Sequence, residues 1–123
     1  MAKVFCFDVD DSLEISNGPI TLQSMMDLRI QGHIVGLCGN WSGFVQKVTG
    51  WQHLISFMNV GTTKEELLTY LKHYVPCDEV IMVGNVFGVK NKLSFAGGSD
   101  DKGAAERAGV RFIKEDDFAN GER

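Results

Sequence analysis

The sequence predicts an α/β protein with a three-layer Rossmann-like fold, in which a five-stranded parallel sheet has helices on both faces. Three observations predict this class. Short apolar segments alternate along the chain with segments of helical period. Several apolar segments end abruptly in glycine or polar residues, as strands do at turns. The 123 residues are enough to bury one hydrophobic core, so we expect a single domain over residues 1–123.

The first half of the chain contains three of the expected strands and two helices. In chain order, these segments are a strand over Val4–Val9, a helix over Ile20–Gln31, a strand over Ile34–Cys38, a helix from Trp41 and a strand over Leu54–Val60. Pro19 precedes the first helix and Gly32 follows it, which suits the start and the end of a helix. Asn40 can cap the second helix because its side chain accepts hydrogen bonds from first-turn amides.

The second half adds two strands, Val80–Val83 and Val110–Ile113, and two helices. Thr63-Lys64-Glu65-Glu66 matches a capping box at the start of the longer helix. The residues expected to be buried along that helix are Leu67, Tyr70, Leu71, Tyr74 and Val75. Ser99 is expected to cap the other helix. Its buried side and its end are expected at Ala104, Ala105, Ala108 and Gly109. The last residues are expected to form a frayed polar tail.

Charge and cysteine content limit the function classes. A formal net charge of −4 argues against a general nucleic-acid binder or a membrane-surface protein. No apolar run reaches the length needed to span a membrane. Cys6, Cys38 and Cys77 form no close pair, and two of them lie in apolar segments, so we expect reduced thiols in a cytoplasmic protein. Phosphorylated substrates stay compatible with this charge, because a local metal can override it.

Three carboxylates, Asp8, Asp10 and Asp11, follow the first strand within four positions. Like charges brought together at the edge of a core raise one another's pKa values unless a cation relieves them. Mg²⁺ prefers carboxylate oxygens and water as ligands, so the cluster predicts a magnesium site. A turn is the alternative explanation, because Asp and Ser are common in turns after strands.

Polar residues also end two other expected strands, at Cys38-Gly39-Asn40 and at Gly84-Asn85. Ligands of parallel α/β sheets bind beyond the carboxyl ends of the strands, so these residues are expected to meet Asp8 and Asp10 at one edge. There the Asp8 carboxylate could attack a phosphoryl group. Asp10 could protonate the departing oxygen and then take a proton from the attacking water. Mg²⁺ would hold the phosphate and screen the two anions.

An apolar strand followed by Asp8-Val9-Asp10-Asp11-Ser12-Leu13 resembles the first motif of the haloacid dehalogenase-like phosphohydrolase superfamily. The resemblance implies that Asp8 is the nucleophile and that Asp10 is the general acid and base. Asp11 stands where the family usually has Gly, and Ser12 stands where it has Thr. The resemblance extends over nearly the whole chain and leaves no room for a cap domain.

The second family motif is a Thr or Ser that ends the second strand and hydrogen-bonds the phosphate. Cys38 occupies that place, and a thiol is only a weak donor. Backbone amides of Gly39 and Asn40, or the hydroxyl of Ser42, could compensate for the missing hydroxyl. A small buried strand residue is the alternative interpretation of Cys38.

The third family motif is a lysine that opens the helix before the fourth strand and steadies the nucleophile and the phosphate. Lys64 matches it. A lysine in a first helical turn opposes the helix dipole, which makes a purely solvated role less expected. Lys47 and Lys72 are weaker candidates because both fall inside helices, away from the strand ends.

The fourth motif usually combines Gly-Asp at a strand end with a second acid before an alanine-rich helix. Here Asn85 stands at the first acid; its oxygen can ligate Mg²⁺ but brings no charge. Asp101 takes the second acidic place, with Asp100 as its rival, although acids in a first helical turn are also favoured without a metal. Val86–Gly98 is longer than the family's usual connection and could form a loop or hairpin near the site.

The resemblance therefore implies a Mg²⁺-dependent phosphomonoester hydrolase that forms an aspartyl-phosphate. The expected catalytic residues are Asp8, Asp10 and Lys64, and the expected substrate-binding residues are Cys38, Gly39 and Asn40. The expected metal ligands are Asp8, Asp10, Asn85 and Asp101. Without a cap, the site suits a phosphorylated small molecule or the phosphate end of a macromolecule, and a partner subunit of an oligomer could screen it. The alternative is a weak or inactive domain of this fold that binds phosphate or a protein, because Cys38 and Asn85 lack the usual chemistry.

Overall fold

The computed structural model of the chain describes residues 2–86 and 100–123. Its centre is a parallel sheet with strand order β2-β1-β3-β4. The strands are β1 (Val4–Phe7), β2 (Ile34–Leu37), β3 (Val80–Gly84) and β4 (Arg111–Lys114). The central strand β1 pairs with β2 and β3, so that Phe7 lies between Leu37 and Val83. The carboxyl ends of these three strands are therefore side by side.

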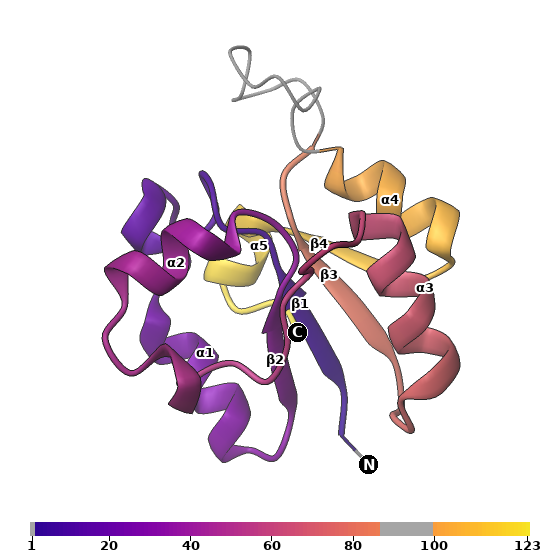
Figure 1. The fold of residues 1–123 in the computed structure, drawn as a ribbon, viewed down its shortest axis with the longest axis horizontal. Helices are drawn as coiled ribbons and strands as arrows, with labels where there is room; N and C mark the ends of the chain where they lie inside the picture. The colour runs from indigo at the N-terminus through magenta and orange to yellow at the C-terminus, as the bar shows by residue number, and fades with distance from the viewer. Residues whose placement is uncertain (1, 87–99) are drawn as a thin grey trace.

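Helices cover both faces of the sheet (Figure 1). On one side lie α1 (Leu22–Ile30), α2 (Trp41–Lys47) and α5 (Glu115–Ala119). On the other side α3 (Lys64–Tyr74) packs against α4 (Asp101–Ala108). Two 3₁₀ turns, Glu14–Ser16 and Trp51–His53, lie in the connections. This three-layer α/β arrangement is compatible with the Rossmann-like class.

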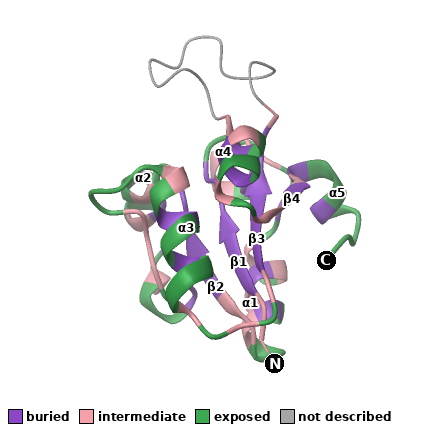
Figure 2. Cartoon of the chain, turned by 90° about the vertical axis from the view of Figure 1, so that its right-hand side faces the viewer, coloured by how far each residue is buried: buried purple, intermediate pink, exposed green. Residues whose placement is uncertain are grey.

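Two hydrophobic cores lie on the two faces of the sheet, because successive strand residues point to opposite sides. Phe5 and Phe7 of β1 belong to the core under α1, α2 and α5. Val4 and Cys6 belong to the core under α3 and α4. Figure 2 shows the buried strands between helices whose outer sides are exposed. Asp8, the next residue with the parity of Cys6, therefore leaves the sheet on the side of α3 and α4.

The expected strand over Leu54–Val60 is wrong, and the described residues form four strands instead of five. This segment makes only one isolated bridge, between Phe57 and Gly36 of β2. Two backbone hydrogen bonds accompany it, from Ser56 to Val35 and from Leu37 to Phe57. The segment touches the sheet edge at one point because its residues after Ile55 are all partly or fully exposed, so no continuous apolar face holds it there.

The expected burial of Tyr70 and Tyr74 along α3 is wrong. Tyr70 and Tyr74 are 58% and 65% exposed, because α3 turns Leu67, Leu68 and Leu71 toward the core instead. The rings of the two tyrosines lie against one another on the outer side, 4.7 Å apart.

The C-terminal residues were expected to be frayed, but they form α5. Phe118 anchors this helix, since its ring is fully buried edge-on against Phe5 and Phe7. At α4 the N-cap is Asp100, whose side chain accepts a hydrogen bond from Gly103 N. The expected cap Ser99 and the expected loop or hairpin over 86–98, except Val86, lie outside the described residues.

Within residues 2–86 and 100–123, none of the helices combines the length and the apolar character that a membrane span requires.

Candidate functional site

Asp8 follows directly after the central strand β1 and is a buried carboxylate at the sheet's carboxyl edge. Its backbone N–H donates to Val83 O of β3 over 2.9 Å, which continues the pairing of the two strands. The residue is 2% exposed. One carboxylate oxygen, Oδ2, is buried and has no hydrogen-bond partner among the residues that the structure describes. Strand pairing therefore holds Asp8 in place, and one of its oxygens has no partner among the described residues.

Lys64 reaches this carboxylate from the first residue of α3. The helix begins at a complete capping box, in which Thr63 and Glu66 each accept a backbone hydrogen bond from the other. The cap fixes where the helix starts, so the lysine side chain leaves from a defined position. Its ammonium group donates to Asp8 Oδ1 over 3.1 Å. The predicted capping box and the predicted proximity of Lys64 and Asp8 are both observed.

Asp101 completes the group from the first residue of α4 and is fully buried. One of its oxygens, Oδ1, accepts a short hydrogen bond from Lys64 Nζ. The other, Oδ2, accepts a hydrogen bond of 2.8 Å from the backbone N–H of Asn85. Both oxygens are therefore used within the protein, and Asp101 holds Lys64 and the end of β3 in place.

Two glycines make room for these carboxylates. A Cβ atom on Gly39 would lie 2.4 Å from Asp8 Oδ1, and one on Gly84 would lie 2.3 Å from Asp101 Oδ2. Real Cβ atoms do not approach other atoms so closely, so either carboxylate would have to move if a side chain were present. The two glycines mark the ends of β2 and β3 in the sequence, but their role beside the carboxylates is visible only in the structure.

The electrostatics of the group favour a proton or a cation on Asp8. Burial, together with the negative charge of Asp101, raises the pKa of Asp8 from its usual 3.8 to about 8, although Lys64 acts in the opposite direction. Burial alone would lower the pKa of Lys64, but the charges of Asp8 and Asp101 outweigh it and raise this pKa well above its ordinary value. One ammonium group serves two buried carboxylates, so the ionised group keeps a net negative charge.

Asp10 lies beyond the strand end and is exposed, unlike Asp8. Its Oδ1 accepts a hydrogen bond of 3.3 Å from Asn40 Nδ2. The oxygen of the same Asn40 amide caps α2 by accepting from Gly43 N, as the sequence predicts. The cap thus directs the amide nitrogen of Asn40 toward Asp10, and Asp10 remains accessible to a substrate or to water.

The expected substrate-binding residues are only partly placed for that role. Cys38 is fully buried in the core between the sheet and α3, and its thiol lies 4.0 Å from Lys64 O. Burial and a hydrogen bond to Cys38 raise the pKa of the neighbouring Cys6 thiol, which disfavours a reactive thiolate at Cys6. The amide of Gly39 already donates to Asn59 Oδ1 over 3.0 Å. The contact of Asn59 with the site was not predicted from the sequence. The only sequence feature that could have indicated it is an amide residue near the end of the expected third strand.

Asn85 follows β3 and is 4% exposed. Its side-chain oxygen accepts a hydrogen bond from Ser12 Oγ, 3.4 Å away, and Ser12 is fully buried. Its side-chain nitrogen, Nδ2, is buried and has no acceptor within the described part of the chain. The amide therefore turns its oxygen toward Ser12 and leaves its two N–H groups unused.

The donor atoms fit Mg²⁺ at two of the four residues expected to hold it. Asp8 has an unpaired buried oxygen, and Asp10 has an exposed carboxylate. Asp101 uses both oxygens internally, and Asn85 turns its oxygen to Ser12. Among residues 2–86 and 100–123, no three His, Cys, Asp or Glu side chains are grouped as a metal site. Mg²⁺ commonly uses one or two carboxylates together with water and substrate phosphate, so the pair of Asp8 and Asp10 still fits it.

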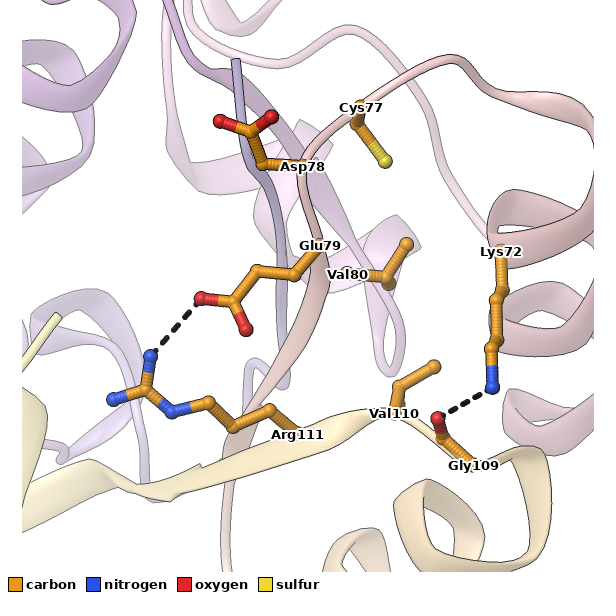
Figure 3. A pocket seen from close by; sticks show the side chains of 8 residues that line it. All are labelled: Lys72, Cys77, Asp78, Glu79, Val80, Gly109, Val110 and Arg111. Atoms are coloured by element: carbon orange, nitrogen blue, oxygen red, sulfur yellow. Dashed lines mark hydrogen bonds and ion pairs between the residues drawn. The ribbon is translucent and has the colours of Figure 1, made fainter. Parts of the chain in front are cut away.

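A pocket of about 260 Å³ lies at the opposite, amino-terminal edge of the sheet, where β3 and β4 begin (Figure 3). Lys72 donates to Gly109 O over 2.8 Å, and Arg111 pairs with Glu79 over 3.1 Å. These cations are used to join the elements around the pocket, and the lining residues do not include Asp8, Lys64 or Asp101. The ammonium group of Lys47 likewise donates to a backbone carbonyl, Ile15 O, over 3.2 Å.

Comparisons with protein-family models, with curated proteins and with solved structures each found no match. The class defined by the fold is an α/β protein with a parallel sheet, of which residues 2–86 and 100–123 form four strands, and with a polar site at the carboxyl ends of the strands.

Proposed function

We propose that the chain is a Mg²⁺-dependent phosphomonoester hydrolase of the haloacid dehalogenase-like kind. The observation that carries the proposal is the contact of Lys64 with both Asp8 and Asp101 at the end of the central strand. Within the described part of the chain, Asp8 Oδ2 is buried and unpaired, and the positive charge of Lys64 is held at the other oxygen of the same carboxylate. Transfer of a phosphoryl group to the protein needs such a combination of a positioned nucleophile and a positive charge.

The reaction begins when a carboxylate oxygen of Asp8 attacks the phosphorus atom. The bond from phosphorus to the leaving oxygen breaks, and an aspartyl-phosphate forms on Asp8. The ammonium group of Lys64 balances negative charge on Asp8 and on the transferred group. Asp101 keeps the ammonium group in that position, since it forms a second ion pair with Lys64.

Asp10 serves as the general acid and base. In the first step it donates a proton to the leaving oxygen, and in the second it takes a proton from the water that hydrolyses the aspartyl-phosphate. Its exposure and its hydrogen bond with Asn40 support this role, because the carboxylate is both accessible and oriented. Asp8 and Asp10 would hold Mg²⁺, and the bound ion supplies positive charge for the phosphate oxygens.

The substrate would be a phosphorylated small molecule or the phosphate end of a macromolecule. This substrate class follows from the resemblance to capless members of the superfamily, whose open sites admit large substrates. A partner subunit of an oligomer would screen the site from water. A cytoplasmic location is supported by the neighbouring thiols of Cys6 and Cys38, which are both free.

The second candidate function is phosphate binding without efficient turnover. The burial of Cys38 favours it, because no hydroxyl stands where the family places its phosphate partner. A lost hydrogen bond to a charged group costs about 1.5–3 kcal/mol, which slows a reaction roughly ten- to a hundredfold. Such a protein would recognise phosphorylated molecules or proteins through the same site.

The test is hydrolysis of a generic aryl phosphate by the purified chain, with Mg²⁺ and with EDTA. Asp8→Asn is expected to abolish Mg²⁺-dependent turnover. Asp11→Asn is the matched control: it removes a carboxylate three positions along, and Asn tolerates the left-handed backbone of Asp11 (φ 59°). Turnover equal in the native chain and in Asp8→Asn, together with no trapping of a phosphate-mimicking fluoride complex, would overturn the enzyme proposal.

A further inference from the structure

The side chain of Asn85 is oriented in a way that does not suit a metal ligand. A planar amide presents its oxygen and its nitrogen in different directions. Here Oδ1 is directed to the hydroxyl of the buried Ser12, and Nδ2 has no acceptor among the described residues. A cation would need the oxygen, whereas the unused group is a donor of two hydrogen bonds.

A buried donor without an acceptor is unfavourable, and an anionic oxygen would relieve it. The unpaired nitrogen belongs to the residue that follows β3, and the unpaired Asp8 Oδ2 belongs to the residue that follows β1. The two strands are paired at these ends through Asp8 N and Val83 O. One phosphate group placed at Asp8 can therefore also supply the acceptor that the Asn85 amide lacks among residues 2–86 and 100–123.

Hydrogen bonds hold both the backbone and the side chain of Asn85. Its backbone N–H is held by Asp101, which in turn holds Lys64. Its amide oxygen accepts a hydrogen bond from Ser12, which is fully buried. The amide nitrogen is thus positioned before a ligand arrives, which reduces the entropy cost of binding.

We propose that Asn85 binds a phosphate oxygen through Nδ2, that Ser12 is the positioning residue for this contact, and that phosphate binding here does not require a divalent cation. The inference deepens the proposed function, since it takes the location of the phosphate at Asp8 from it. Asn85 then recognises the substrate phosphate, and the residues that hold Mg²⁺ are Asp8 and Asp10.

The experiment is a calorimetric titration with inorganic phosphate in the presence of EDTA. The native chain is expected to show saturable binding. Asn85→Asp replaces the donor with an acceptor of nearly the same shape and should weaken that binding by about tenfold or more. Asn120→Asp is the matched control, because it makes the same chemical change at an exposed residue and should leave the affinity unchanged.

Ser12→Ala is expected to weaken metal-free phosphate binding by about threefold, and Ser12→Thr, which keeps the hydroxyl, should restore it. In the native chain, the side-chain amide resonances of Asn85 should shift on phosphate addition, which tests the contact even where a variant fails to fold. No phosphate binding in EDTA, an unchanged affinity in Asn85→Asp, or an unperturbed Asn85 resonance each overturns the inference.

The two proposals fail separately. Mg²⁺-dependent turnover without phosphate binding in EDTA removes the inference and leaves the enzyme proposal in place. Asn85-dependent phosphate binding without turnover on aryl phosphates does the reverse.

Discussion

Lys64 and Asp101 form an ion pair between the first residues of α3 and α4, with Asp101 fully buried and Lys64 partly buried, although 37 positions separate them in the chain. The two helices pack side by side on one face of the sheet, and the pair joins their amino-terminal ends. Lys64 also donates to Asp8, so one ammonium group links both helices to the central strand. The geometry of the site therefore depends on the packing of three elements.

Removal of the Lys64 charge should destabilise the fold strongly. Lys64→Met keeps most of the side-chain volume but leaves Asp8 and Asp101 buried without their cation. Breaking a buried pair by removing one partner costs about 3–5 kcal/mol, and urea unfolding at pH 7 measures it. Lys72→Met is the control, because its ammonium group bonds one surface carbonyl, and a loss of less than about 1 kcal/mol is expected. Equal losses in the two variants would contradict the assignment of a central role to Lys64.

Asp8 should make the protein less stable as pH rises in metal-free buffer. Its pKa is about 8 in the folded state and 3.8 without the fold, so between these values the folded state holds a proton that the unfolded state releases. The stability from this proton is complete below pH 3.8 and is lost as pH rises through about 8. Asp8→Asn should therefore stabilise the protein by more at pH 8 than at pH 5, by an amount on the order of 4 kcal/mol.

The measurement is urea unfolding in EDTA at pH 5 and pH 8, for the native chain, Asp8→Asn and Asp11→Asn. The difference between the two pH values should shrink only in Asp8→Asn. A pH dependence that is the same in all three proteins would show that the Asp8 pKa is not raised.

A methyl group at either site glycine should displace a carboxylate. Gly39→Ala would bring Cβ to 2.4 Å from Asp8 Oδ1, and Gly84→Ala would bring it to 2.3 Å from Asp101 Oδ2. We expect losses of about 1–3 kcal/mol in unfolding free energy and weaker phosphate binding in both variants. Gly61→Ala is the control: it meets no atom within 4 Å, so it should cost only the strain of its left-handed backbone and leave phosphate binding unchanged. Unchanged phosphate affinity in all three variants would contradict the close approach.

The C-terminal helix should contribute to global stability through one aromatic side chain. Phe118→Ala removes a fully buried ring that contacts Phe5 and Phe7, at centroid distances of 6.2 and 5.1 Å. The expected loss is about 3–5 kcal/mol, which thermal or urea unfolding can measure. Tyr74→Ala removes an exposed ring of similar size and should change stability by less than about 0.5 kcal/mol. A small effect of Phe118→Ala would show that α5 is not docked.

Much of the fold could be predicted because its signals are local. The apolar segments before Asp8, Asn40 and Asn85 are strands, and the capping box at Thr63 starts α3 as expected. These features depend on periodicity and on hydrogen bonds within a few residues. The wrong expectations depend on distant contacts: Leu54–Val60 has strand-like residues, but only Phe57 bridges β2.

The candidate site likewise has features that the sequence predicts and features that only the structure shows. The sequence places carboxylates and amides at the strand ends, and Lys64 at a helix start, because both follow from local patterns. It does not show that Asp101 has both oxygens engaged or that Gly39 N is used by Asn59. Those facts follow from the packing of α3, α4 and the segment after α2 around the sheet.

By itself, the sequence determined the α/β alternation, the helix caps and the residues available at the carboxyl edge of the sheet. Only the tertiary structure decided how they are used: Asp8 is buried with a raised pKa, Asp10 is exposed, and the Asn85 amide turns its oxygen to Ser12. The physical reason is that burial and hydrogen-bond partners depend on segments brought together from distant parts of the chain. Local patterns select the residues of the site, and packing sets their charge and orientation.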